Sequence, residues 1–593
     1  MTRVLLIVAV FIGLHTMAAA AQDAASERAL NEIIDEYERL IRLEDPISAG
    51  QDGDREALRR LPDPRRTTEL SMARRFEALG ERLSRIEART LSAQSALNHA
   101  LLTRSIAEAV EEAQFDFGRI AFENDSGFHT LGDYLARTTT IARSDDADAW
   151  LARLEATPAY YRRNIENLRR GVQTGYTQPR IVVERVLEVA RRQALAPPQE
   201  SPLLLPLVRM PSNIPPQAQG RYRDSALAVV REHILPLQRE FVTFLEREYL
   251  PAARPKLAWR STANGAVSYS FLVRRETTTN LTPDEIHALG QSEVNRIRGL
   301  MEETIRESGF VGSFTEFLHM LRTDPRFYAK TPQELLEKAS EIAKRADYAL
   351  PPLFATLPRL PYGVRPAPAE IAEGYTTGRY WSGSMALGQA GGYIVNTSRL
   401  DQRPLYELPA LTMHEAAPGH HLQIALSQEL ENLPYFRRSA GPTAFVEGWG
   451  LYSEFLGEEM GIYRDPYERF GRYSYEMWRA CRLVADTGIH WLGWDIEQAR
   501  RCFTENTALA PHNIQTELER YLSWPGQALA YKIGELRLRA LRKEAQERLG
   551  QSFNVREFHD AVLLGGALPL DVLETRVREW IATKAPAAAS GGR

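Results

Sequence analysis

The chain has 593 residues, a formal net charge of −4, 44% hydrophobic residues and 25% charged residues. This length is several times that of one domain, and the mean hydropathy of −0.35 is ordinary for a globular protein. Positive and negative residues are mixed along the chain. The basic face of a nucleic-acid-binding protein is therefore not indicated, and no nucleic-acid partner is expected.

Residues 1–21 are expected to form a cleaved signal peptide. A short positive region at Met1–Arg3 precedes an apolar run at Val4–Leu14, and small residues follow as far as Ala21. The run is too short to span about 30 Å of hydrocarbon, so we expect a periplasmic or secreted protein without a membrane span. Export would permit a disulfide between Cys481 and Cys502, and two buried thiols are equally compatible with the sequence.

Residues 22–350 are expected to form a helical N-terminal lobe, because apolar residues recur there at three- and four-residue spacing. Thr282 followed by Pro283 marks one helix start, since threonine caps helices and proline is favoured at their first position. The expected helical segments are Ala25–Leu43, Glu69–Glu112, Asp148–Arg170, Gln178–Arg192, Gln219–Tyr249 and Asp284–Ser308.

A proline-rich connection is expected at residues 351–370, followed by a second lobe at residues 371–585 and a flexible tail at residues 586–593. The second lobe begins with a small β-element before helical periodicity returns. A strand can bind an extended peptide through its backbone, so Gly392 and Tyr393 are candidate substrate-binding residues. The expected fold class is mainly α. The expected strands are Tyr375–Tyr380, Met385–Gln389 and Gly392–Asn396.

The motif that carries chemistry is HEAAPGHH at residues 414–421, which holds three of the 12 histidines. A zincin helix uses H-E-x-x-H because residues four apart share one face, so that two imidazoles reach one Zn²⁺. The glutamate after the first histidine takes a proton from the water that the metal activates. His414 and Glu415 fit these roles, but Pro418 stands where the second histidine belongs.

Two histidines could replace the missing ligand. On an unbroken helix His421 lies about 20° from His414 around the axis, although about 10 Å further along it, whereas His420 points about 120° away. Pro418 and Gly419 disfavour a regular helix, and a bulge there could bring either histidine to the metal. The sequence slightly favours His421 as the ligand, and His420 would then bind substrate.

Glu447 in the segment TAFVEGWGLYSE is the candidate third ligand of a site for one zinc ion. It follows Phe445 and Val446, an apolar setting in which an unpaired carboxylate is costly and a cation relieves the cost. Glu454 lies on nearly the same helix face two turns later and could hold a ligand histidine by its other ring nitrogen. The alternative is that both glutamates are solvated helix residues.

The pattern H-E-x-x-P-G-H-H-L-Q followed by E-G-W-G-L-Y-x-E resembles the bacterial domain-of-unknown-function family 885. The similarity covers most of the chain and is sharpest from Gly374 to Ile533. More distantly, the spacing is similar to that of helical gluzincin peptidases of the angiotensin-converting, thimet-oligopeptidase and thermostable-carboxypeptidase types. That resemblance implies a two-lobed helical zincin-like fold with a deep cleft.

The gluzincin resemblance also implies a role for each matching residue. Those roles are metal ligand for His414, for His421 or His420, and for Glu447, base for Glu415, and oxyanion donor for His490 and Tyr531. Taken from their helical contexts alone, His490 and Tyr531 are equally compatible with structural roles.

The sequence thus predicts an exported zinc metallohydrolase, a peptidase acting on short peptides or small amide substrates. One alternative is a metal-dependent hydrolase or lyase of a non-peptide small molecule. The other is a helical binding protein that has lost catalysis, in which Pro418 and Gly419 would mark decay of the metal site.

Overall fold

The computed structural model describes residues 2–124, 126–368, 372, 375–385, 388–439 and 441–584, with side chains from Asp23 onward. The side chains of the expected signal peptide and the whole of the expected tail lie outside the described residues. Within the described part of the chain, no helix is long and apolar enough to cross a membrane.

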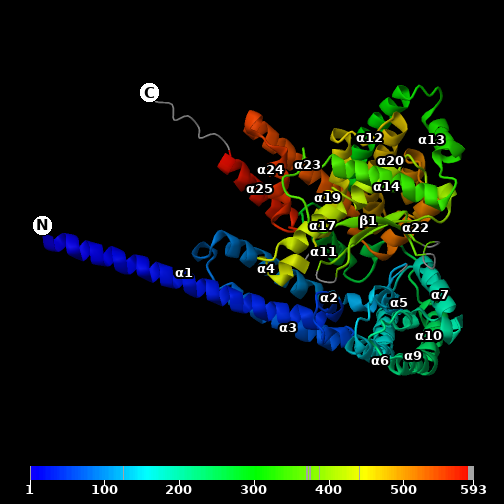
Figure 1. The fold of residues 1–593 in the computed structure, drawn as a ribbon, viewed down its shortest axis with the longest axis horizontal. Coiled ribbons are helices and arrows are strands. Elements are labelled where there is room, and N and C mark those ends of the chain that lie inside the picture. The colour runs from blue at the N-terminus through cyan, green and yellow to red at the C-terminus, as the bar shows by residue number, and fades with distance from the viewer. Residues whose placement is uncertain are drawn as a thin grey trace. The chain divides into compact units, whose positions relative to one another are not determined.

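The chain divides into two units, residues 1–255 and 256–593 (Figure 1). Among its described residues the first unit consists of helices joined by loops, with two isolated β-bridges, Phe122 to Gly127 and Pro179 to Arg254. Two π-helical turns, Val230–Ile234 and Leu245–Tyr249, continue its last helices without a break. The helices of this unit are α1 (Thr2–Glu44), α2 (Pro46–Gln51), α3 (Arg66–Leu83), α4 (Ala93–Glu112), α5 (Phe128–Thr138), α6 (Ser144–Thr174), α7 (Arg180–Leu195), α8 (Leu205–Val208), α9 (Pro216–Val229) and α10 (Leu235–Phe244).

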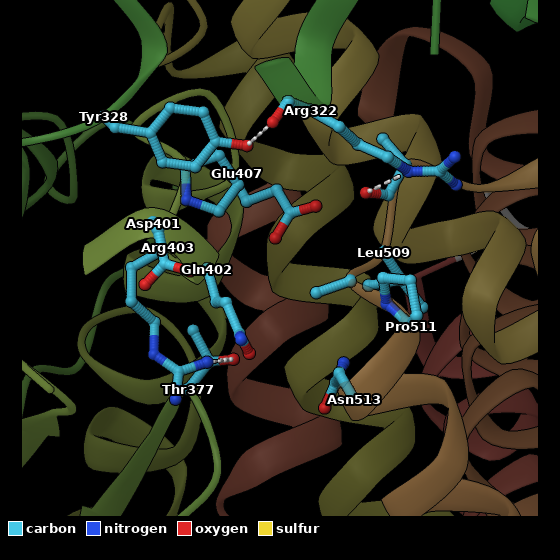
Figure 2. A pocket seen from close by; sticks show the side chains of 13 residues that line it. Arg322, Tyr328, Thr377, Asp401, Gln402, Arg403, Glu407, Leu509, Pro511 and Asn513 are labelled. Carbon is cyan, nitrogen blue, oxygen red and sulfur yellow. Dashed lines mark hydrogen bonds between the residues drawn. The ribbon is translucent and has the colours of Figure 1, made fainter. Parts of the chain in front are cut away.

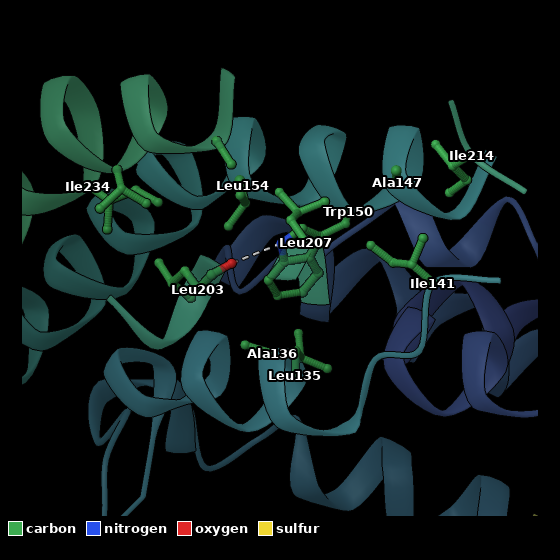
Figure 3. Close-up of a cluster of buried hydrophobic side chains, with 12 residues drawn as sticks. Leu135, Ala136, Ile141, Ala147, Trp150, Leu154, Leu203, Leu207, Ile214 and Ile234 are labelled. Atoms are coloured by element: carbon green, nitrogen blue, oxygen red, sulfur yellow. Dashed lines mark hydrogen bonds between the residues drawn. The ribbon is translucent and has the colours of Figure 1, made fainter. Parts of the chain in front are cut away.

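The first unit has a hydrophobic core built around Trp150 on α6 (Figure 3). The indole is 3% exposed, and its Nε1–H donates a 3.0 Å hydrogen bond to the main-chain oxygen of Leu203. Leu135 of α5 and Ile234 beyond α9 belong to the same cluster. Burial of these side chains stabilises the unit because it removes apolar surface from water, and the indole leaves no unpaired polar group behind.

The second unit contains the small sheet and the remaining helices. These are α11 (Gly265–Thr277), α12 (Pro283–Glu307), α13 (Phe314–Thr323), α14 (Pro332–Tyr348), α16 (Leu408–Glu415), α17 (His420–Glu429), α18 (Tyr435–Ser439), α19 (Thr443–Glu459), α20 (Pro466–Thr487), α21 (Ile496–Asn506), α22 (Pro511–Ser523), α23 (Ala530–Leu549), α24 (Val555–Leu563) and α25 (Leu570–Lys584).

The sheet has strands β1 (Tyr362–Pro366), β2 (Gly378–Trp381) and β3 (Gly391–Val395) in the order β1-β3-β2. Strand β3 lies in the centre, parallel to β1 and antiparallel to β2, and Tyr393 pairs with Val364 on one side and Tyr380 on the other. The central strand is buried at every position, whereas the edge strands are partly exposed.

Long helices of the second unit pack in pairs, α12 along α20 and α19 along α23. Lys532 on α23 is fully buried, and its ammonium lies 2.7 Å from Glu476, 2.8 Å from Glu535 and 3.0 Å from Glu293. A buried charge persists only when it is paired. This lysine therefore ties α12, α20 and α23 together at one point.

The prediction of a mainly α fold is confirmed. Each expected helical segment is helical over most of its length, although Glu69–Glu112 forms two helices, α3 and α4, and Thr282 caps α12 with a reciprocal bond to Glu285. The expected strand Met385–Gln389 is wrong, because Ser384 and Gln389 form an isolated antiparallel bridge and Met385 and Gly388 are turn residues.

The sequence did not predict β1, which lies in the proline-rich stretch. Since β1 pairs with β3, the expected boundary at residues 351–370 falls inside the second unit. The division into two lobes with a cleft stays a prediction.

Candidate metal centre

The HEAAPGHH motif is two helices with a break between them. Helix α16 ends at Glu415, residues 416–419 are not helical, and α17 begins at His420. The chain folds back against the end of α16 so closely that a side chain at Gly419 would collide with the main-chain oxygens of Met413 and His414. Glycine is therefore required at position 419, and the break sets the direction of the second histidine.

The break brings His420, and not His421, beside His414 and Glu447. Nε2 of His414 lies 3.4 Å and Nε2 of His420 lies 3.5 Å from Oε2 of Glu447. The two imidazole rings are perpendicular, with centroids 4.6 Å apart. Among the described residues, these three form the one group of histidine, cysteine and acidic side chains whose ligand atoms lie within 4.8 Å of one another.

The spacing of these three side chains fits a metal better than it fits hydrogen bonds. N–H···O bonds are about 2.7–3.2 Å long, whereas ligand atoms about 2.0–2.1 Å from a tetrahedral zinc ion are about 3.4 Å apart. Oε2 of Glu447 is buried and has no hydrogen-bond partner, and the same is true of Nδ1 of His420. A buried carboxylate oxygen without a partner is costly, and a cation between the three groups would remove that cost.

The electrostatics of the centre also favour a cation. Burial alone would lower the pKa of His414, but the carboxylates of Glu447 and Glu454 outweigh burial and raise it to about 9. Burial opposes ionisation of Glu447, yet the two histidines lower its pKa well below the usual value. The centre therefore prefers an ionised carboxylate facing positive charge.

Glu454 contacts His414 at Nδ1, the ring nitrogen that does not face Glu447. The distance between Nδ1 of His414 and Oε1 of Glu454 is 2.8 Å, and this carboxylate is 1% exposed. Arg479 of α20 lies 3.2 Å from the same oxygen. This geometry is compatible with the role predicted for Glu454. The contact between Arg479 and Glu454 could not be predicted from the sequence, because it joins α20 to α19.

Two glycines of the EGWGLY segment make room for the centre. A Cβ atom at Gly450 would lie 2.6 Å from Cε1 of the His414 ring, and one at Gly448 would lie 2.5 Å from Cα of Gly534 on α23. The first glycine admits the imidazole, and the second lets α19 and α23 approach closely. Neither requirement is visible in the sequence without the partner helix.

Glu415 lies at the end of α16 and is 7% exposed. Its Oε2 accepts a 2.8 Å hydrogen bond from the main-chain N–H of Tyr380 on β2. The small sheet therefore fixes the carboxylate of the predicted base next to the candidate metal ligand His414.

His421, which the sequence favoured as ligand, faces the sheet. Its Nδ1 lies 3.0 Å from the Tyr380 hydroxyl, and its ring packs 4.5 Å from that of Tyr362. Burial lowers the pKa of His421 to about 4, so the ring is neutral. On an unbroken helix His421 would share a face with His414, but the break before His420 removes that relationship.

Of the predicted oxyanion donors His490 and Tyr531, His490 is engaged away from the candidate centre. Nε2 of His490 lies 2.8 Å from the main-chain oxygen of Tyr521, and this histidine is fully buried. Tyr531 is half-buried, with the guanidinium of Arg482 4.1 Å above its ring. The ring of Tyr531 therefore lies in a positively charged environment. The role of its hydroxyl as an oxyanion donor stays a prediction.

Gly392 and Tyr393, the candidate substrate-binding residues, lie on the central strand β3. Both are buried, and pairing with β1 and β2 occupies both edges of the strand. The Tyr393 hydroxyl accepts a 3.3 Å hydrogen bond from Thr412 on α16. These residues join the sheet to α16, the helix that carries His414, and an added peptide strand could pair only with an edge strand.

The chain belongs to a family of bacterial proteins of unknown function, DUF885, whose model matches residues 46–577. The predicted family resemblance is therefore confirmed. No curated protein matches the chain.

Two solved structures share this fold. One is the putative lipoprotein from Colwellia psychrerythraea, with 27% identity, a TM-score of 0.88, and coverage of 94% of this chain and 100% of that one. The other is a putative lipoprotein of unknown function from Shewanella oneidensis, with 18% identity, a TM-score of 0.68, and coverage of 93% of this chain and 99% of that one.

Proposed function

We propose that this protein is an exported hydrolase that uses one zinc ion to cleave short peptides or small amides. The observation that carries the proposal is the buried, unpartnered Oε2 of Glu447, 3.4 Å from His414 and 3.5 Å from His420. Two histidines and one glutamate are also the zinc ligands of thermolysin and carboxypeptidase A. The residues present thus fit the ion.

A zinc ion held here would supply a Lewis acid that makes water acidic near neutral pH and polarises a carbonyl. Glu415 would then act as base and acid. Its Oε2 is held by the main-chain N–H of Tyr380, so its Oε1 is the atom to receive the proton of the attacking water and return it to the leaving amine. Glu454 would keep Nε2 of His414 directed at the ion.

Export is supported by two observations. Cys481 and Cys502 form a disulfide between α20 and α21, and disulfides persist mainly in oxidising compartments outside the cytosol. Both similar solved structures reported above are described as putative lipoproteins. We therefore place this protein in the cell envelope or outside it.

Pro418 and Gly419 bear on the alternative of a decayed binding protein. The break that they make positions His420 beside Glu447, so the departure from H-E-x-x-H supplies a second histidine instead of removing one. This observation favours a working centre.

The proposal is tested by incubating the zinc-loaded protein with a mixed peptide library and identifying products by mass spectrometry. We expect cleavage that stops when zinc is chelated and returns when zinc is added back. Cleavage that persists unchanged after full chelation would overturn the metal mechanism. Absence of cleavage in a fully zinc-loaded sample would overturn the peptidase assignment.

A further inference from the structure

A second site lies at the opposite end of the helix that carries His414 and Glu415. A cavity of about 220 Å³ opens beside the first turn of α16, and Figure 2 shows the side chains that line it. Its walls combine charged residues with the apolar residues Leu509 and Pro511. This space is many times what one water molecule requires.

Glu407, directly before α16, points into this cavity. Glu407 is 6% exposed, and its Oε1 has no hydrogen-bond partner. Figure 2 shows the carboxylate in the middle of the lining residues. Burial raises the pKa of Glu407 to about 8, although Arg403, Arg479 and Arg322 oppose the rise. No described group donates to Oε1 of Glu407, and a cation bound beside it would favour the ionised form that burial disfavours.

Arg403 supplies a guanidinium to the same cavity. Its Nε is buried and without a partner, and its Nη1 donates a 3.3 Å bond to the hydroxyl of Thr377. Arg322, in contrast, is occupied, because its guanidinium donates to the main-chain oxygens of Thr507 at 2.6 Å and Ala508 at 3.3 Å. Asp401 also lines the cavity but is exposed to solvent. The buried carboxyl group of Glu407 and the guanidinium of Arg403 face the same cavity and do not pair with each other.

We infer that this cavity binds a small zwitterion of the α-amino-acid type. Its ammonium would donate to Glu407, its carboxylate would accept from Arg403, and an apolar side chain would contact Leu509 and Pro511. A simple anion would face the Glu407 carboxylate, and a simple cation would face the Arg403 guanidinium. Only a ligand with both charges satisfies both unpaired groups.

This inference does not depend on the proposed function. Helix α16 has eight residues, so its first turn and the metal centre at its last turn are about 10 Å apart. An amino acid could also bind directly to a zinc ion, so the two sites must be told apart by experiment. Binding in the cavity should be the same with and without metal.

The test is calorimetric titration of the full chain with L-leucine, before and after removal of metal by a chelator. We expect saturable binding of similar strength in both samples. N-acetyl-leucine, which lacks the ammonium, and leucinamide, which lacks the carboxylate, should each bind at least about tenfold more weakly. No saturable binding of L-leucine up to about 10 mM, or binding that disappears with the metal, would overturn the inference.

Substitutions inside and outside the cavity test where the ligand binds. Glu407→Gln should weaken L-leucine binding at least about tenfold, whereas Glu431→Gln, at an exposed position outside the cavity, should not change it. Asn513 is half-buried and lines the cavity, so Asn513→Trp should block binding even if Glu407→Gln fails to fold. Unchanged binding in a folded Glu407→Gln or Asn513→Trp protein would contradict the assignment.

Discussion

His414 and Glu454 are joined by a 2.8 Å contact between Nδ1 of the imidazole and Oε1 of the carboxylate. An ionised carboxylate can only accept, so Nδ1 carries the hydrogen. In the neutral ring the lone pair is then on Nε2, the atom that faces Glu447. The pair therefore fixes both the tautomer and the direction of one proposed metal ligand.

Glu454→Gln should weaken zinc binding about 10- to 100-fold, because loss of a carboxylate behind a ligand histidine reduces its basicity and its orientation. Zinc affinity is measured by competition with a chromophoric chelator. The matched control is Glu458→Gln, one turn further along α19 and exposed, which should bind zinc like the wild type. Equal affinity in both variants would remove Glu454 from the centre.

Gly450→Ala should reduce zinc affinity without removing any ligand. The added methyl group would lie 2.6 Å from Cε1 of His414, which is closer than carbon atoms pack, so the ring must move. Gly441→Ala is the control, since its methyl group would meet only Val446, at an ordinary 3.6 Å. If Gly450→Ala binds zinc as tightly as Gly441→Ala, the close approach of α19 to His414 is not important for the site.

Much of the fold and part of the candidate metal centre could be predicted from the sequence. Helical periodicity and the cap at Thr282 predicted the helices because they depend on neighbours along the chain. Four candidate residues of the centre could be proposed from the sequence. Helix geometry relates His414 to Glu415 on α16 and Glu447 to Glu454 on α19, and the family pattern supported both pairs.

The choice between His420 and His421 could not be made from the sequence. It depends on the path of residues 416–419, which the close approach of Gly419 to the end of α16 determines. Strand β1 was missed because it lies among prolines and is stabilised by pairing with β3, 29 positions later in register at Tyr362 and Gly391. Both features are set by contacts distant in sequence, which local patterns do not contain.

Glu415→Gln should retain zinc and lose about 10²- to 10⁴-fold in turnover, because an amide cannot take the proton that a general base receives. Zinc content is measured by elemental analysis, and turnover on any peptide that the wild type cleaves. A fully active Glu415→Gln protein would exclude Glu415 as base. Loss of zinc together with activity would instead make Glu415 part of the metal site.

Asp486 should make the second unit less stable as the pH rises. It accepts hydrogen bonds from the Tyr269 hydroxyl at 2.6 Å and from Gly526 N–H at 3.1 Å, and burial raises its pKa to about 7. An unfolded aspartate titrates at about 3.9. The stabilisation is therefore complete below that pH and is lost as the pH rises through about 7.

The measurement for Asp486 is urea denaturation at about pH 5 and about pH 8. The midpoint of the wild type should fall more between these values than the midpoint of Asp486→Asn, because asparagine does not titrate. Comparing the change in midpoint between the two pH values in the two proteins removes the contribution of other titrating groups. It also removes any effect of the substitution that does not depend on pH. Parallel changes in the two proteins would show that Asp486 does not titrate differently on folding.

The central claim is that His414, His420 and Glu447 hold one divalent ion, and the neighbouring histidines test it most directly. Zinc bound per chain should be measured for the wild type, His420→Ala and His421→Ala after the same zinc loading and dialysis. We predict one equivalent in the wild type and in His421→Ala, and little in His420→Ala. Full zinc in His420→Ala, or loss of zinc only in His421→Ala, would contradict the account.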